Sequence, residues 1–139
     1  MFSKKLQYGL RFLLLLRGSE GLQYMGVAEL VEQEKMPRKF VEAIAVALKK
    51  AGLVEVKRGA NGGYRLARSL SSISLLDVWL VLDPSEEEAS VEGGTVRQKV
   101  VGGFLQDVSN QYQAMLGSIM LDQLEGLLLK ENDKMMYYI

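Results

Sequence analysis

The 139-residue sequence contains no cysteine and no histidine. Without cysteine, the chain forms no disulfide and offers no thiolate to a zinc ion or an iron–sulfur cluster. Without histidine, it offers no imidazole ligand and lacks the base of the Ser-His-Asp and Cys-His constellations. An enzyme built on this chain would rely on carboxylates, Lys, Ser or Tyr. No acid/base pair at a meaningful spacing stands out, so we expect no enzyme.

Long hydrophobic runs are also missing. The segment that follows Lys4 and Lys5 is uninterruptedly apolar only over residues 12–16, and Arg17 ends it. A membrane-spanning helix needs about 18 or more apolar residues, and a signal peptide also carries a small-residue cleavage site. Neither pattern is present, and we expect a soluble, cytoplasmic protein without a membrane segment.

The net charge is zero, because 17 Lys and Arg balance 17 Asp and Glu, but the charges are unevenly distributed along the chain. Residues 1–69 hold 13 basic and 6 acidic residues, which gives +7, whereas residues 70–139 hold 4 and 11, which gives −7. Such a split predicts a basic half that binds nucleic acid and an acidic half that does not. The apolar content of 48% is typical of a folded chain.

The pattern of residues 36–68 predicts a helix, a tight turn and a β-ribbon. Apolar residues recur at helical steps of four, four and three, at Phe40, Ile44, Leu48 and Ala51. Pro37 suits the first turn of this helix, and Gly52 suits its end. Arg38 and Lys39 lie near its start, where cations oppose the helix dipole. That cost makes sense if this end meets phosphates and base edges; the alternative is a solvated surface.

A glycine-rich hairpin follows this helix. Val54 and Val56 alternate as in a strand, Asn61-Gly62 predicts a type I′ turn, and residues 64–66 form the return strand. Basic residues flank the turn on both strands: Lys57, Arg58, Arg65 and Arg68. An arginine on a slim ribbon can enter a minor groove. A phosphate-binding loop is disfavoured, because no GxxxxGK[ST] pattern or following helix is present. A plain hairpin with incidental basic residues is the other alternative.

Three further helices are expected in the first 82 residues, over 4–17, 27–34 and 75–82. Ser3 can cap the first, whose inward positions are Leu6, Leu10, Leu13 and Leu14. The second, with the helix after Pro37, gives a helix-turn-helix pair. Ser74 and Asp77 form a capping box for the third, which carries Trp79 as a core residue.

A long helix is expected over residues 95–120. Its apolar residues follow heptad steps of four and three, at Val101, Leu105, Val108, Tyr112, Met115 and Ile119. One small domain cannot cover so wide a stripe, so we expect a second copy of the chain as partner; an intramolecular core helix is the alternative. Residues 121–129 are predicted to form a short helix and residues 130–139 a frayed tail.

Three segments carry a resemblance to a known family. The strings AGLVEVKRGANGGYRLAR (51–68), SKKLQYGL (3–10) and ISLLDV (73–78) resemble the Rrf-type bacterial transcriptional regulators. The resemblance implies a mainly α fold with a small β-ribbon, a winged helix-turn-helix plus a long dimerisation helix. Cluster-binding members place cysteine ligands in the loop that corresponds to residues 83–94. This acidic loop has none, so we expect a member without a cofactor.

The resemblance also implies which residues meet DNA. Arg58 matches the wing arginine of the minor groove. Arg38, Lys39 and Glu42 match the recognition-helix positions that face the major groove. The full expected DNA-binding set is Ser3, Lys4, Lys5, Arg38, Lys39, Glu42, Lys57, Arg58, Asn61 and Arg65. Met36 departs from the pattern, because its side chain is a poor helix N-cap.

These observations divide the chain into three parts. Residues 1–82 are expected to form a winged helix-turn-helix domain, residues 83–94 an acidic loop, and residues 95–139 a dimerisation helix with a C-terminal tail. The expected function is that of a dimeric, sequence-specific DNA-binding regulator, with a palindromic operator and with repression as the family default. The alternative is a winged-helix interaction module whose output depends on a partner protein or a small-molecule effector.

Overall fold

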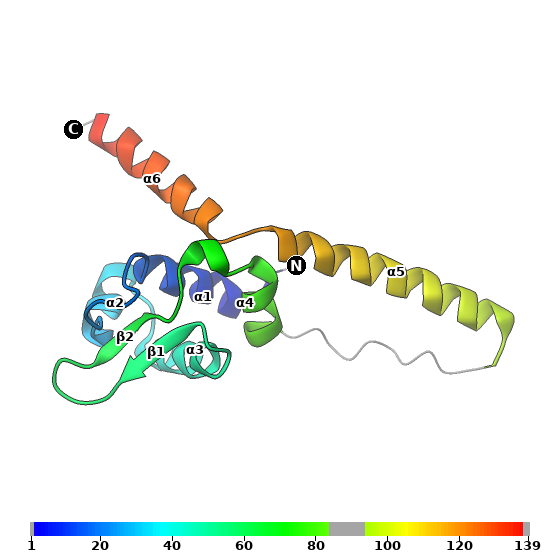
Figure 1. Cartoon of the computed structure of the whole chain (residues 1–139), viewed down its shortest axis with the longest axis horizontal. Helices are drawn as coiled ribbons and strands as arrows, with labels where there is room; N and C mark the ends of the chain where they lie inside the picture. The colour runs from blue at the N-terminus through cyan, green and yellow to red at the C-terminus, as the bar shows by residue number, and fades with distance from the viewer. Residues whose placement is uncertain (1, 84–93, 138–139) are drawn as a thin grey trace.

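The computed structural model describes residues 2–83 and 94–137, so the expected acidic loop lies almost wholly outside the described residues. Helices dominate these ranges (Figure 1). The elements are α1 (Lys4–Leu15), α2 (Val27–Glu34), α3 (Arg38–Lys50), β1 (Val54–Lys57), β2 (Gly63–Leu66), the 3-10 turn η1 (Leu70–Ser72), α4 (Leu75–Leu82), α5 (Val96–Ser118) and α6 (Asp122–Tyr137).

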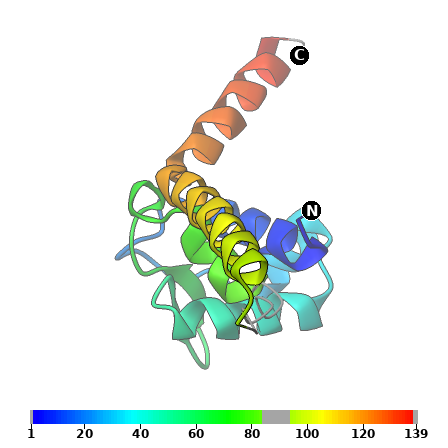
Figure 2. The same cartoon turned by 90° about the vertical axis from the view of Figure 1, so that its right-hand side faces the viewer.

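Helices α1 to α4 and the β1–β2 ribbon pack into one body around a shared apolar core (Figures 1 and 2). Helix α1 lies against both α3 and α4. Gly9 permits the close approach to α4, because a Cβ at this position would overlap the side chain of Leu82. Helices α2 and α3 form the helix-turn-helix and the ribbon forms the wing. The predicted mainly α winged helix-turn-helix fold is confirmed.

Two of the predicted buried stripes are shifted. On α1 the buried large residues are Leu6, Phe12 and Leu13, whereas Leu10 and Leu14 are only half-buried. On α3 the buried residues are Val41, Ile44, Ala45 and Leu48. Phe40 is 47% exposed, with its ring centroid 5.6 Å from that of Tyr8. Each helix meets neighbours on two sides, so its buried face is wider than a simple step pattern predicts.

The start of α3 also differs from the expectation. Pro37, not Met36, occupies the N-cap position, and its carbonyl oxygen accepts from the amides of Phe40 and Val41. Met36 is 1% exposed and belongs to the core. The residue that looked like a poor cap is therefore an apolar anchor for the turn between α2 and α3.

The wing is an antiparallel ribbon in which Val54 pairs with Leu66 and Lys57 with Gly63. Five residues, 58–62, remain to form the tip, so the predicted two-residue type I′ turn at Asn61-Gly62 is wrong. Positive φ occurs at Asn61 (64°), as that turn requires, but not at Gly62, and Gly59 (95°) also has positive φ. Gly63 has a separate role, because a Cβ there would overlap the carbonyl oxygen of Met25. Met25 and Tyr64 exchange two backbone hydrogen bonds, each 2.8 Å long.

Helices α5 and α6 project away from this body (Figures 1 and 2). Thr95 and Gln98 form a capping box at the start of α5, and only the C-terminal part of the helix packs on the body, through Leu116. Helix α6 continues to Tyr137, so the predicted frayed tail from residue 130 is wrong. Residues 130–136 contain no Gly or Pro that would end a helix. None of the helices in the described ranges combines the length and hydropathy of a membrane span.

Candidate nucleic-acid interface

A groove runs between α3 and the wing. Its helix side is lined by Arg38, Glu42, Val46, Lys49 and Lys50, and its wing side by Val56, Lys57, Arg58 and Gly59. The first residues of α2 close one end of the groove. Five cations thus face one carboxylate in a channel open to solvent. This composition fits a polyanion, because phosphate contacts supply most of the affinity for nucleic acid.

The only carboxylate among these lining residues is paired with one of the cations. The guanidinium Nε of Arg38 donates to Glu42 Oε1 across 3.2 Å, one helical turn apart. Both side chains are more than half exposed, at 73% and 53%. An exposed pair of this kind contributes little to stability and exchanges partners readily. Both groups are therefore available to a base edge in the major groove, as a donor and an acceptor.

The wing tip presents side chains to solvent. Lys57, Arg58 and Asn61 are all exposed. Lys57 Nζ lies 5.9 Å from the ring centroid of Tyr24. Within the described ranges, Arg58 has neither an ion pair nor a side-chain hydrogen bond among the contacts of the chain. Arg58 is therefore the wing cation with most freedom to reach a ligand.

Arg65 is placed differently from Arg58, at the base of the wing. Its Nε donates to Glu55 Oε2 across 2.7 Å, and its Nη1 donates to the carbonyl oxygen of Leu22 across 2.8 Å. The guanidinium carbon lies 4.3 Å from the ring centroid of Tyr24. The hydrogen bond to Glu55 raises the pKa of Arg65 above its ordinary value. The structure therefore engages Arg65 within the chain, and DNA contact by this residue stays a prediction.

The start of α1 lies away from the wing tip (Figure 1). Ser3 caps the helix, since its Oγ accepts from the amide of Leu6 across 3.1 Å. Its own amide donates to Asp83 Oδ2 across 3.3 Å. Lys4 and Lys5 are exposed. The rings of Tyr8 and Phe40 meet at a tilt and join this end of α1 to the start of α3.

Several groove residues were not singled out from sequence as site residues, among them Val46, Lys49, Lys50 and Tyr64. Tyr64 on β2 lines the groove yet is only 7% exposed, and its ring meets that of Phe12 edge-on, with 5.5 Å between centroids. Burial raises the pKa of Tyr64, and the nearby carboxylate of Glu42 raises it further, against an opposing effect of Arg38. Tyr64 therefore remains neutral beneath the charged surface.

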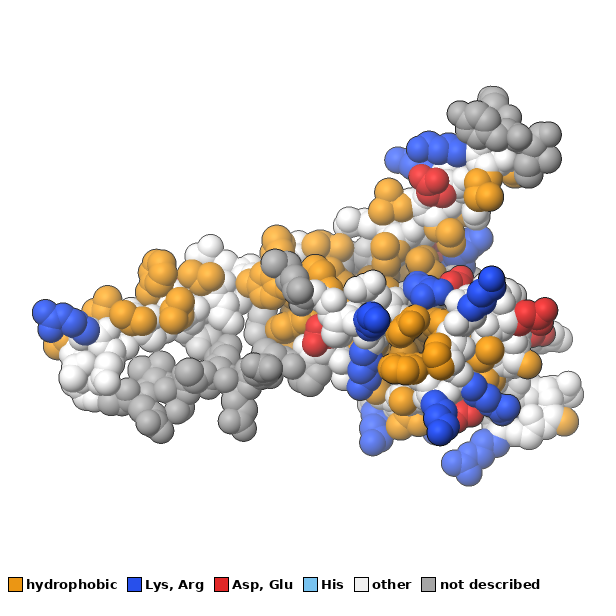
Figure 3. All heavy atoms as spheres, turned by 180° about the vertical axis from the view of Figure 1, so that it is seen from behind, with side chains coloured by type: hydrophobic (Ala, Val, Ile, Leu, Met, Phe, Trp, Pro, Cys, Tyr) orange, Lys and Arg blue, Asp and Glu red, His pale blue; other side chains and the backbone are white. Residues whose placement is uncertain are grey.

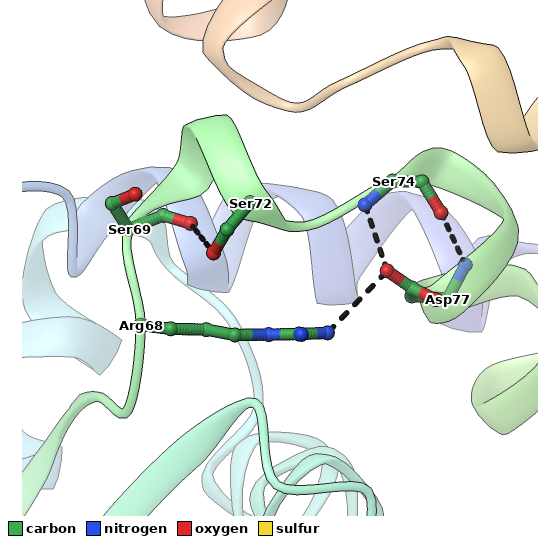
Figure 4. A network of polar contacts seen from close by, with 5 residues as sticks. All are labelled: Arg68, Ser69, Ser72, Ser74 and Asp77. Carbon is green, nitrogen blue, oxygen red and sulfur yellow. Dashed lines mark hydrogen bonds and ion pairs between the residues drawn. The ribbon is translucent and has the colours of Figure 1, made fainter.

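Arg68 lies outside the groove, in a polar network beside η1 (Figure 4). Its Nη2 is 3.4 Å from Asp77 Oδ2, the same oxygen that accepts from the amide of Ser74 across 2.9 Å. Ser72 Oγ donates to the carbonyl oxygen of Ser69 across 2.8 Å. The predicted capping box of Ser74 and Asp77 is confirmed, and Arg68 is tied to it.

The groove, the wing and the fold together agree with one family of known proteins. A family model described as "Iron-dependent Transcriptional regulator", named Rrf2, matches residues 2–125. The chain belongs to the Rrf2 family. The family and its relatives are described as transcriptional regulators.

Individual relatives of this Rrf2-family chain are distant. The "HTH-type transcriptional regulator IscR" of Cereibacter sphaeroides is 30% identical over 98 residues, which cover 70% of this chain and 63% of the relative. "Protein rrf2" of Nitratidesulfovibrio vulgaris is 35% identical over 88 residues, which cover 62% of this chain and 56% of the relative. The chain thus spans less than two thirds of the length of these curated relatives.

Solved structures support the same fold. A structure of IscR from T. potens is 30% identical, with a TM-score of 0.67, and the match covers 91% of this chain and 88% of the other. CymR of Staphylococcus aureus is 27% identical, with a TM-score of 0.62, and the match covers 88% and 95%. CymR of B. subtilis, at 23% identity and a TM-score of 0.66, is similar in fold.

The donor groups of this Rrf2-family chain do not fit a thiolate-bound iron cluster. The family description names iron, yet the sequence holds neither cysteine nor histidine. Iron–sulfur clusters are held by cysteine thiolates, with histidine as the replacement at some sites. Across residues 2–83 and 94–137, no group of three acidic side chains is gathered for a metal either. The sequence therefore offers neither the thiolates nor the imidazoles that hold such a cluster.

Proposed function

We propose that this chain is a dimeric, sequence-specific DNA-binding transcriptional regulator that acts without an iron–sulfur cluster. The observation that carries the proposal is the convergence of α3 and the wing on one basic groove. A recognition helix enters a major groove, and a wing at its side reaches the adjacent minor groove or backbone. An interaction module that binds only proteins has no need of so many cations on both sides of one channel.

The contacts divide into two classes. Arg58 at the wing tip, with Lys49, Lys50 and Lys57 around the groove, would meet phosphates and a narrow minor groove, which position the protein. Arg38, Lys39 and Glu42 on the recognition helix would meet base edges, where Arg and Lys donate to guanine and Glu accepts from cytosine. The exposed ion pair of Arg38 and Glu42 would open for such contacts.

A second copy of the chain is supported by the apolar face of α5. Val101, Leu105, Val108 and Met115 are between 49% and 57% exposed, and Phe104 is 67% exposed. Figure 3 shows hydrophobic side chains along this helix, with Lys and Arg side chains at its outer end, and further Lys and Arg side chains over the winged-helix body. A contiguous apolar surface of this extent is typical of a protein–protein interface. Two copies would place two α3 helices in successive major grooves of a palindromic site.

The C-terminal part of the predicted seam packs within the chain as well. The rings of Tyr112 and Trp79 meet edge-on at 6.0 Å, and Ile119 follows the end of α5, with its carbonyl oxygen accepting from the amide of Leu75. We therefore assign the dimer contact mainly to the exposed part of α5, from Val101 to Met115, and give Tyr112 and Ile119 the added role of anchoring the helix.

The test is a titration of the purified protein against the DNA upstream of its own gene, beside a scrambled duplex, at low and high salt. We expect tight binding that depends on sequence, with two chains per site. Equal and weak binding to both duplexes that vanishes with salt would mean that only the electrostatic attraction exists. That result would contradict the proposal and would favour a partner protein or effector that completes the DNA-competent form.

A further inference from the structure

The outermost face of α3 carries an apolar centre between two lysines. Lys39, Ala43, Val46 and Lys50 follow one another at steps of four, three and four, so they form a single stripe on the side of the helix opposite the core. All four are exposed, and Val46 is 55% exposed. We define these four residues as the outer stripe of α3.

Packing within the described body does not explain this apolar centre. Val46 is on the opposite side of α3 from the buried Val41, Ile44 and Leu48. A β-branched residue on an exposed helix surface also lowers helix propensity. A polar residue at this place would favour both the helix and its solvation. The surroundings are strongly basic, because Lys39 and Lys50 flank the centre and other cations line the adjacent groove. Charge complementarity therefore selects a polyanion as the occupant rather than an apolar protein surface.

The base edges in the major groove indicate which group the apolar centre would contact. Among the edges of the four bases there, only thymine presents a methyl group, and small apolar side chains are its usual contacts. Ala43 and Val46 lie about 4.5 Å apart along the helix axis, close to one base-pair step of about 3.4 Å. Two small side chains also allow the helix to approach the groove floor closely, while the lysines at either end reach phosphates.

We propose that Val46, supported by Ala43, determines specificity by contacting thymine C5-methyl groups at neighbouring positions of each operator half-site. This inference rests on the proposed function and deepens it. Apolar contacts would then contribute to recognition of the DNA sequence, in addition to the polar contacts of Arg38, Lys39 and Glu42. The half-site is accordingly expected to contain a thymine-rich step beneath the middle of α3.

The test replaces thymine by deoxyuridine, which lacks only the C5-methyl group. The site that wild-type protein binds is first located on unmodified upstream DNA, with a scrambled duplex as control. Thymines within the bound region are then replaced one at a time. Burial of one methyl group favours binding by about fourfold, so we expect about fourfold weaker binding at each contacted position and no change elsewhere.

The protein side of the test uses Val46→Ala, which removes two methyl groups from an exposed position and should not lower the thermal midpoint, because alanine favours the helix. We expect Val46→Ala to bind the thymine duplex several-fold more weakly and to lose the preference for thymine over deoxyuridine. Leu80→Ala is the matched control, because Leu80 is 50% exposed but lies on α4, and this variant should keep the preference.

The outcomes separate the two proposals. If wild-type protein binds its upstream DNA specifically but tolerates deoxyuridine at every position, the methyl contact is wrong while the proposed function stands. The same conclusion follows if Val46→Ala keeps the full thymine preference. If wild-type protein does not distinguish the upstream DNA from the scrambled duplex even with thymine present, the proposed function fails first, and the methyl contact fails with it.

Discussion

The guanidinium group of Arg65 lies over the ring of Tyr24, 4.3 Å from its centroid, and joins the loop before α2 to the base of the wing. Glu55, the cross-strand partner of Arg65, holds the same group from the other strand across 2.7 Å. The carbonyl oxygen of Leu22 completes the arrangement. Arg65 thus connects three segments, and its geometry suits a residue that sets the direction of the wing.

This arrangement predicts that Glu55→Gln weakens DNA binding, although removal of a carboxylate, which DNA repels, would by itself strengthen binding. Loss of the carboxylate leaves Arg65 without its charged partner, so the wing loses a constraint and binding falls a few-fold. A direct DNA contact by Arg65 predicts the opposite result, because removal of an acidic neighbour would free the guanidinium and strengthen binding. A titration at fixed salt distinguishes the two, with Glu29→Gln on α2 as a control for the change in net charge.

The two arginines that flank the ribbon should differ in their effect on DNA binding. Arg58 is exposed at the wing tip, whereas Arg68 is 3.4 Å from Asp77 in the network of Figure 4. We expect Arg58→Ala to weaken binding and to reduce the slope of log affinity against log salt by about one per copy. Arg68→Ala should leave that slope unchanged and lower the free energy of unfolding by about 0–1 kcal/mol, as for other surface pairs. Equal losses of affinity would contradict the ranking.

The sequence predicted the local elements well because their signals are local. The capping box of Ser74 and Asp77 lies within four residues, and it places α4 at Leu75–Leu82 as the structure has it. Gly52 was expected to end α3 with positive φ, and it has a φ of 75°. Such signals depend on the chain's own backbone, so they do not require knowledge of what packs nearby.

The errors arose where distant segments meet. The sequence placed Gly63 in the hairpin but did not reveal that a Cβ there would overlap the carbonyl oxygen of Met25, 38 positions earlier in the chain. Phe40 was assigned to the core, yet it is 47% exposed and its ring meets that of the half-buried Tyr8 on α1 at a tilt. The contacts of Arg65 with Glu55, Tyr24 and Leu22 were not foreseen from the sequence, while its DNA contact stays a prediction. Residue spacing carries no information about such long-range contacts, which decide the detail of the site.

Tyr64 gives the structure a characteristic response to high pH. Its folded-state pKa is raised above the ordinary value of about 10, chiefly by burial and then by Glu42. In the unfolded chain Tyr64 therefore releases its proton at a lower pH than in the folded protein. The stabilisation is complete below about pH 10 and is lost as the pH rises through the folded-state pKa.

We accordingly expect Tyr64→Phe to flatten the alkaline end of the stability profile. Denaturant unfolding between about pH 8 and 11 would measure the free energy of unfolding of wild type and variant. The difference between the two profiles removes the contributions of the other tyrosines and of the lysines. Tyr24→Phe is the control, because it removes a phenol from a less buried position. A wild-type profile that falls no more steeply than that of Tyr64→Phe would contradict the expected direction.

The exposed apolar face of α5 predicts that one charged substitution on it dissociates the dimer into monomers. Leu105 is 57% exposed in the single chain, at the middle of the proposed contact. Leu105→Asp would bury a carboxylate in an apolar interface, which is costly without a partner. We expect a monomer by sedimentation with an unchanged helix content. Operator binding should weaken by roughly a hundredfold or more, because the two recognition helices would no longer act together.

Asn110→Asp supplies the matched control for that charge. Asn110 lies on the same helix but on the opposite side from Leu105, where its Oδ1 accepts from Gln106 Nε2 across 3.0 Å. The variant introduces the same carboxylate on the same element, so a general effect of charge on α5 would appear in both proteins. We expect Asn110→Asp to remain dimeric and to bind the operator as the wild type does. If both variants dissociate, the dimer contact extends around α5; if neither does, it lies elsewhere, and α6 with its exposed Leu127 and Met135 becomes the surface to test.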